Sequence, residues 1–214
     1  MNFDSGRFIE ALVSRSIPHI PEHLQLVLIP LAIATAIAFP AGVLLTRSRY
    51  QRYKTVIMGI FNAGQTIPPL AVIALFFPFL GLGYRPAVIA LTLYALLPIA
   101  RNTLAGISAV PREVKEAARG MGMTEWQILK EVEIPLALPV VISGIKTSAV
   151  LTAGTAALAA LIGGKGMGAV IFAGINFFRV ELILAGTIYI GMMAVLFDRV
   201  LTYLGHRFTA PHMK

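Results

Sequence analysis

The sequence predicts an all-α membrane protein with five transmembrane helices, and two observations carry that prediction. Of the 214 residues, 57% are hydrophobic and 13% are charged, and the mean hydropathy is +0.79. A soluble domain carries roughly 25% charged residues, so the low charge density is typical of a membrane protein. The apolar residues also gather into runs of about 20 or more, the length that a helix needs to cross a bilayer. Cysteine is absent, which excludes disulfides and thiol chemistry.

The apolar runs define the expected spans of a single transmembrane domain over residues 1–214. They are Leu24–Thr46, Val56–Leu80, Pro86–Ile107, Leu136–Ile162 and Leu182–Leu204. Prolines inside several spans are expected to kink them, because neighbouring helices can satisfy the freed backbone groups. The stretch before the first span is polar, is interrupted by Pro18 and Pro21, and lacks the basic-then-apolar plan of a cleaved signal peptide.

The basic residues of the loops set the expected orientation, because cytoplasmic loops carry an excess of Lys and Arg. On one side lie Arg47, Arg49, Arg52, Lys54, Arg101, Arg112, Lys115, Arg119, Lys130, Arg199, Arg207 and Lys214, and on the other lie Arg7, Arg15, Arg85, Lys165 and Arg179. The richer side is expected to be cytoplasmic, with the N-terminus outside and the C-terminus inside. This topology explains the net charge of +8, so no nucleic-acid partner is expected.

The predicted spans offer little that could power transport or catalyse a reaction. Their interiors contain no Asp or Glu, since Glu181 and Asp198 lie near the ends of the fifth span. A proton-driven carrier is therefore not expected, and no acid–base constellation indicates an enzyme. His19 and His23 have a metal-ligand spacing, but Pro21 between them argues against a helical metal face. No GxxxxGK[ST] phosphate loop occurs. We therefore expect the chain to hold no metal or cofactor, and any pumping to be powered by another subunit.

Two features of the fourth predicted span have two interpretations each. Lys146 either extends along its apolar stem to the cytoplasmic interface or faces a polar path between subunits. Small residues recur at every fourth position, which allows close approach of a helix from this chain or from a second subunit. They are Gly144, Ser148, Thr152, Ala156 and Ala160.

The second predicted span contains a polar stretch, NAGQTIPPL, at residues 62–70. Asn62, Gln65 and Thr66 come just before the prolines Pro68 and Pro69. Their side chains either satisfy backbone carbonyls that the proline kink frees or line a solute path. The sequence leaves both interpretations open.

Residues 111–135, between the third and fourth spans, predict a pair of short helices. Pro111 suits a first helical turn, and Val114, Ala117, Ala118 and Met121 recur at helical spacing on one face. On the other face, Glu116 and Arg119 are spaced to pair. The two signs of charge are nearly balanced in this segment, which favours a protein partner over a lipid surface.

A glycine turn is expected to separate the two helices. Gly122 suits the C-terminal cap of the first helix, and Thr124 with Gln127 has the spacing of a capping box for the second. The second helix is expected to present Trp126 and Leu129 on one side and to end by Ile134–Pro135.

The same segment resembles the signature loop of permease subunits of binding-protein-dependent ABC importers. The family pattern is Glu-Ala-Ala, three residues, Gly, nine residues, then Ile-x-Leu-Pro. Here it is Glu116-Ala117-Ala118, then Gly122, then Val132-Glu133-Ile134-Pro135, with Val and Ile in place of Ile and Leu. Five spans with this loop between the third and fourth also resemble the small importer permeases.

The sequence of residues 64–107 resembles that of the glycine betaine, carnitine and choline osmoprotectant permeases. The similar stretches are GQTIPPLA, LGLG, LYALLPI and RNT. The methionine permeases share the architecture but not these sequence stretches. One departure lies in the loop at residues 162–168, where Lys165 replaces a residue that is usually small in the family.

The resemblance implies an assembly in the prokaryotic cytoplasmic (inner) membrane. Two permeases, identical or related, form the pathway above two ATPase subunits that bind ATP and Mg, and an extracytoplasmic binding protein delivers the solute. Contact with the ATPase is expected at Glu116, Ala117, Ala118, Gly122, Trp126, Val132, Ile134 and Pro135. Contact with the binding protein is expected at Gly164, Lys165 and Gly166.

A quaternary amine is the expected solute, imported along a path with few charges and some aromatic rings. Cation–π contacts in such a path contribute about 0.5–2 kcal/mol. The expected lining is Phe61, Asn62, Gln65, Thr66, Pro68, Pro69 and Tyr94. The alternatives are a methionine-type amino-acid importer and, less favoured, an ATP-independent channel or carrier.

Overall fold

The computed structural model describes residues 4–208, and these residues form helices without a β-strand. The α-helices are α1 (Ser5–Glu10), α2 (Ile20–Leu44), α3 (Lys54–Thr66), α4 (Pro69–Leu80), α5 (Tyr84–Ser108), α6 (Arg112–Gly120), α7 (Glu125–Gln127), α8 (Ile134–Thr155), α9 (Met167–Asn176) and α10 (Val180–Phe208). Shorter π- and 3₁₀-helical turns join several of them. Lys214, which contributed to the expected orientation, lies outside the described residues.

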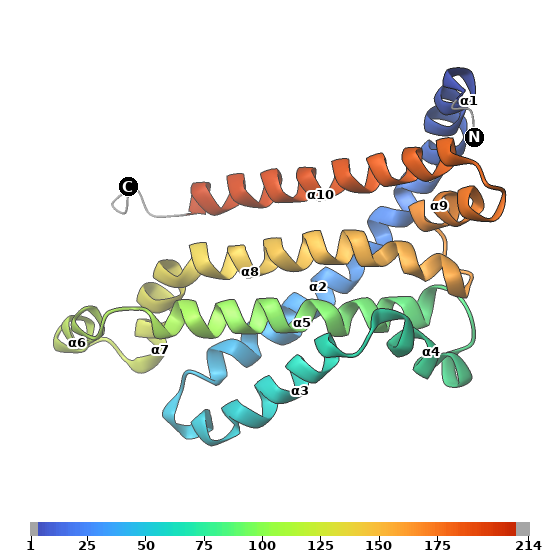
Figure 1. The fold of residues 1–214 in the computed structure, drawn as a ribbon. Coiled ribbons are helices and arrows are strands. Elements are labelled where there is room, and N and C mark those ends of the chain that lie inside the picture. Colours follow the sequence, from blue (N-terminus) through green and yellow to red (C-terminus); the bar gives the residue numbers. More distant parts are fainter. Residues whose placement is uncertain (1–3, 209–214) are drawn as a thin grey trace.

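The helix bundle is built around α5 and α8, which lie side by side and antiparallel (Figure 1). On the other side of α8 lies α10, while α2 crosses α5 and α8 obliquely and α3 packs against α5. The core between them contains fully buried side chains such as Leu26, Leu91 and Ile99. The N-terminus and α9 lie at one end of the bundle, and α6, α7 and the end of α10 lie at the other.

Four helical stretches of the described chain are long and apolar enough to cross a membrane. They are Ser5–Leu44, Tyr84–Ser108, Glu125–Ile162 and Val180–Gly205, and they contain four of the five predicted spans, apart from the last residues of the first. A bent pair, Ser48–Thr66 with Pro69–Leu80, makes five if it counts as one span. The chain is thus an all-α protein with multiple candidate spans, as the composition predicts.

The predicted span Val56–Leu80 consists of two helices, because α3 and α4 meet at an angle of 98° at the prolines that were expected to kink it. Ile67, between them, has an extended backbone with φ −71° and ψ 131°. Proline disfavours the helical conformation in the residue before it, and two consecutive prolines remove two backbone donors. Pro68 and Pro69 therefore end α3 and start α4 in a new direction.

Two helix boundaries also differ from the prediction. The second helix of the 111–135 segment does not end at Ile134–Pro135, because helical backbone continues from Glu125 to Ile162. Pro135 lies two residues after a π-helical turn, Ile128–Glu133, and occupies the first turn of α8, where proline is tolerated. Near the N-terminus, Pro18 and Pro21 likewise occupy first turns, so residues 5–44 form a continuous helical stretch.

Candidate functional site

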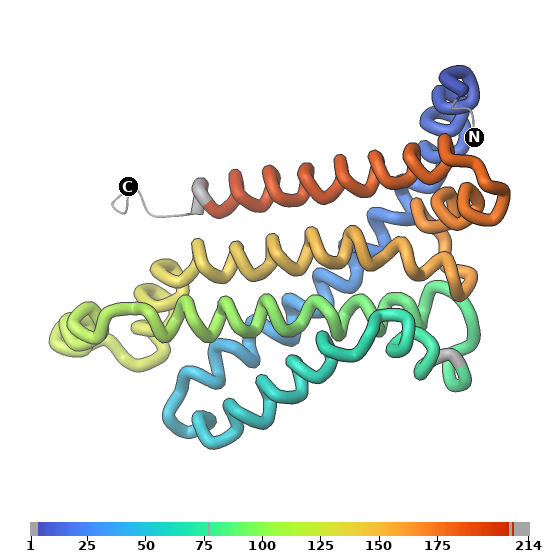
Figure 2. Tube along the Cα trace, viewed as in Figure 1, coloured from blue at the N-terminus to red at the C-terminus, as the bar shows by residue number. Residues whose placement is uncertain are grey.

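The segment 111–135 forms a helix, a tight turn and a second helix at one end of the bundle. Figure 2 follows the trace through α6, the turn and α7. Gly122 has φ +82°, in the left-handed region, and its N–H donates to the carbonyl of Arg119 at 2.9 Å. The Met123 N–H donates to the carbonyl of Ala118 at 3.2 Å. The glycine turn is confirmed.

The capping box at the start of α7 is also confirmed. The Gln127 N–H donates to Thr124 Oγ1 at 3.3 Å, and the Thr124 N–H donates to Gln127 Oε1 at 2.8 Å. Each residue thus satisfies a backbone donor that would otherwise lack a partner at the helix start. The turn and the box together fix the direction in which α7 leaves α6.

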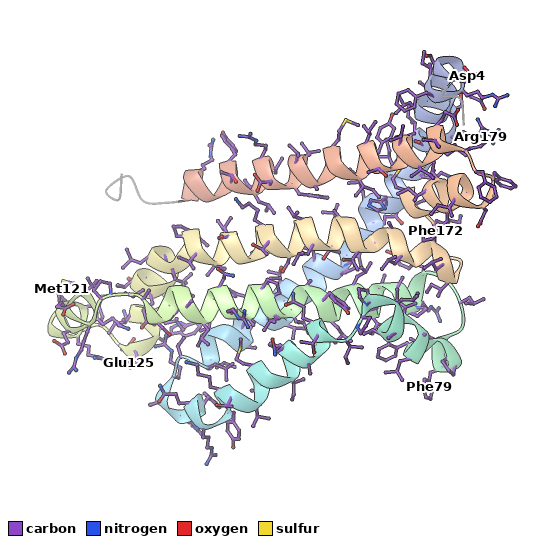
Figure 3. The ribbon with its side chains drawn as sticks, viewed as in Figure 1. Asp4, Phe79, Met121, Glu125, Phe172 and Arg179 are labelled. Carbon is purple, nitrogen blue, oxygen red and sulfur yellow. The ribbon has the colours of Figure 1, made fainter. Side chains whose placement is uncertain are left out.

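Two large apolar side chains of this segment, Met121 and Trp126, are 75% and 69% exposed. Ala118 and Leu129 are buried, so the expectation that Leu129 shares an exposed side with Trp126 is wrong. Figure 3 shows Met121 and Glu125 at the far end of the molecule, away from the bundle. The rest of the described chain therefore leaves this apolar surface open.

The surface ion pairs differ from the predicted one. Glu116 accepts a hydrogen bond from Arg112 Nε at 2.6 Å, one helical turn away, rather than pairing with Arg119. Arg119 Nε instead donates to Glu125 across the turn at 2.8 Å. This hydrogen bond raises the pKa of the Arg119 guanidinium above its ordinary value. The turn brings Glu125 back to α6, a contact that helix spacing alone does not reveal.

The motif residues Val132, Ile134 and Pro135 lie where the π-helical turn passes into α8. Between them, Glu133 is 3% exposed and forms ion pairs with Arg47 and Lys115. Sequence reasoning missed Glu133, because it occupied the variable position of the motif. Its only local signal was a charge within an otherwise apolar stretch.

The residues predicted to line a path are only partly brought together. Gln65 Nε2 donates to the Tyr94 carbonyl at 3.2 Å, which joins α3 to α5. Thr66 Oγ1 donates to the Ala63 carbonyl at 3.0 Å, but this carbonyl also accepts the Ile67 N–H and is not one that the prolines free. Asn62 is exposed, and Phe61 packs against the core. Pro68 and Pro69 form the break itself, and the path role of these residues stays a prediction.

The small-residue stripe begins on α8, continues into the 3₁₀-helical turn Ala156–Ile162, and packs within this chain. Ser148 Oγ donates to the Ala95 carbonyl of α5 at 2.8 Å. A Cβ on Gly144 would lie 2.6 Å from Asn102 Cβ, so α5 and α8 approach too closely there for a larger residue. The helix that the stripe accommodates is therefore α5.

Lys146 has a partner that neither interpretation included. Its Nζ lies 3.2 Å from Asp198 Oδ1 and 3.4 Å from Thr202 Oγ1, so the pair joins α8 to α10. Charged residues within a membrane span need such partners.

The loop Gly163–Gly166, predicted to contact a binding protein, is attached to the start of α2. Glu22 accepts from Lys165 Nζ at 3.3 Å and from the Gly166 N–H at 3.3 Å, and it lies 2.9 Å from His19 Nδ1. The backbone of Gly164 packs so close to Ala159 that no side chain would fit there. Within residues 4–208, no group of three or more His, Asp or Glu side chains is arranged to hold a metal. The binding-protein contact stays a prediction.

The geometry can now be compared with known proteins. Residues 38–210 match the family model described as binding-protein-dependent transport system inner membrane component. The chain belongs to this family. It is therefore a multi-pass inner-membrane component of a transport system, and not an enzyme.

Curated relatives and solved structures agree with this assignment. The chain is 41% identical to the glycine betaine/carnitine/choline transport system permease protein OpuCB of Bacillus subtilis, over 88% of this chain and 86% of that protein. It is 43% identical to the osmoprotectant import permease protein OsmY of Salmonella typhimurium, over 89% and 80% respectively. The fold matches a chain of the MetNI methionine ABC transporter in an inward-facing conformation, with a TM-score of 0.73 and 24% identity, over 93% of this chain and 98% of that one.

Proposed function

We propose that this family member is the permease subunit of an ATP-driven importer for a quaternary amine, such as glycine betaine, choline or carnitine. The observation that carries the proposal is the identity of about 40% over most of the chain to permeases named for these solutes. The amino-acid transporters that share the fold are only 20–24% identical, and this likeness concerns the fold alone.

The 111–135 segment is the proposed contact with the ATPase. The exposed Met121 and Trp126 give it an apolar surface, and the capped turn gives it a fixed shape. Glu116, Ala117 and Ala118 lie on α6 next to this surface. A partner ATPase would bind ATP and Mg, and closure of its dimer would displace α6 and α7. The spans would then change between an inward-open and an outward-open state, and nucleotide binding would favour one of them over the other.

The orientation, the domain and the other partners belong to the same proposal. The whole chain, residues 1–214, forms one permease domain with α6 and α7 on the cytoplasmic side and the N-terminus outside. A second permease, identical or related, completes the pathway. A binding protein docks on the outer side, where Lys165 is exposed beside Gly164 and Gly166.

The proposed path for the amine runs beside the break between α3 and α4. Gln65 is bonded to the backbone of Tyr94, which places an amide beside an aromatic residue. A quaternary ammonium has no N–H to donate, so aromatic faces and neutral oxygen atoms are suitable contacts for it.

Reconstituted uptake tests the proposal. The chain would be purified with its ATPase and placed in lipid vesicles with the binding protein. Uptake of labelled glycine betaine, choline, carnitine and methionine would be measured with and without ATP. We expect ATP-dependent uptake of at least one quaternary amine and none of methionine. Uptake of methionine alone would identify the amino-acid alternative, and uptake that does not need ATP would identify a channel or carrier.

A further inference from the structure

A buried carboxylate, Glu133, joins three separate parts of the chain. Only 3% of the residue is exposed, and its side chain lies at the junction between the π-helical turn and α8. Arg47 Nη2 donates a hydrogen bond to Glu133 Oε2, and Lys115 Nζ lies 3.6 Å from Oε1. A buried charge is costly unless it is paired, and Glu133 is paired here with two cationic side chains.

The three residues come from different elements. Arg47 follows the end of α2, Lys115 belongs to α6, and Glu133 immediately precedes α8. Both cationic side chains are also largely shielded from solvent, at 27% and 23% exposure. Ion pairs of exposed side chains contribute little, but shielding from water strengthens the attraction between charges. We call this three-residue cluster, Arg47–Glu133–Lys115, the clamp.

Other ion pairs at this end of the described chain do not make such a connection. Arg112 pairs with Glu116 within α6, and Arg119 pairs with Glu125 across the turn, so both stay inside the 111–135 segment. A cavity of about 930 Å³, which Lys115 and Arg47 both line, lies between α6 and the end of α2. The clamp therefore links α6 to the first span beside an open space.

We propose that Glu133 is a positioning residue that transmits the displacement of α6 to α2 and α8 together. This inference rests on the proposed function, because it needs an ATPase that moves α6. Glu133 itself touches neither nucleotide nor solute. Without its charge, Arg47 and Lys115 would repel each other, and α6 would move without carrying the end of α2 with it.

The test compares Glu133→Gln with Glu131→Gln in the complete reconstituted complex. Glu131 is the matched control, because it lies on the same helical turn but is exposed. Uptake and ATP hydrolysis would be measured on the same vesicles, and their ratio gives the coupling. We expect Glu133→Gln to lower uptake per ATP by about tenfold, while ATP hydrolysis changes by less than about twofold. Glu131→Gln is expected to keep the wild-type ratio.

A double-mutant cycle separates the clamp from a general loss of stability. Arg47→Gln and Glu133→Gln are each expected to lower the ratio, and the double variant is expected to be no worse than either single one. If Glu133→Gln fails to assemble, Lys115→Gln gives the same measurement with a partly exposed side chain. Wild-type coupling in either Glu133→Gln or Lys115→Gln, or additive effects in the double variant, would overturn the proposal. If the wild-type complex shows no ATP-dependent uptake, the proposed function fails and the clamp fails with it.

Discussion

Substitution of Gly122 tests the backbone conformation of the turn between α6 and α7 without changing side-chain packing. Its φ of +82° lies in the left-handed region, and a Cβ added there would meet no atom within 4 Å. The cost of Gly122→Ala is therefore backbone strain alone, roughly 1–2 kcal/mol, which lowers the ratio of the native turn to its alternatives by roughly 5- to 30-fold. Because this turn sets the direction of α7 and the position of Met121, binding of the ATPase should weaken by up to the same factor.

The chain supplies a matched series for this prediction. Gly120 is helical and also has open space around it, so Gly120→Ala is the control and should keep or improve binding. Asparagine tolerates the left-handed region better than alanine, so Gly122→Asn should lie between the wild type and Gly122→Ala. Titration of the detergent-solubilised permease with its ATPase would measure the affinity, and vesicle uptake would measure the consequence. Wild-type affinity and uptake in Gly122→Ala would refute the reasoning.

Three further substitutions test the packing of the spans and the cap of α7. Gly144→Ala should lower the thermal midpoint in detergent by an overpacking cost of about 1–3 kcal/mol, whereas Gly154→Ala, with nothing nearby, should not; equal midpoints would contradict the observed packing. Lys146→Met leaves Asp198 unpaired, so it should lower the thermal midpoint more than the double variant Lys146→Met with Asp198→Asn. A lower midpoint in the double variant would exclude the ion pair. Thr124→Ala removes the capping box, at about 1 kcal/mol, and should weaken ATPase binding about fivefold in the same titration; an unchanged affinity would show that the cap does not position α7.

The sequence predicts most strongly what depends on neighbouring residues. The apolar runs locate the long helices, Gly122 locates the turn, and Thr124 with Gln127 gives the capping box, because each signal acts within a few residues. The predicted helix end at Pro135 was wrong for the same reason. Proline is a local stop signal, but here helical backbone continues from the π-helical turn into α8. The prolines at the end of α3 predicted a kink, but its angle depends on packing that the local sequence does not contain.

Contacts between distant residues could not be predicted. Glu133 is 86 residues from Arg47, and its burial follows from how α2, α6 and α8 meet. Lys146 was recognised as unusual, yet its partner Asp198 was assigned only to the end of another span. Charge and spacing identify residues that need a partner, but only the tertiary structure identifies the partner.

α2 is joined to the helical stretch Glu125–Ile162 near both of its ends, and these contacts determine how a displacement would pass through the molecule. At one end, Arg47 is paired with Glu133. Toward the other end, the buried His23 lies with Nε2 3.1 Å from the Ala153 carbonyl, and Glu22 binds Lys165 in the loop that follows the helix.

The 22 residues of α8 alone have a length of roughly 33 Å, which already exceeds the hydrocarbon thickness of a bilayer, and helical turns extend α8 at both ends. A displacement applied at α7 would therefore reach the loop at residues 163–166 through one continuous helix and would carry α2 with it. In the proposed importer, this arrangement would connect the ATPase surface to the surface that the binding protein contacts, without a relay of intermediate loops.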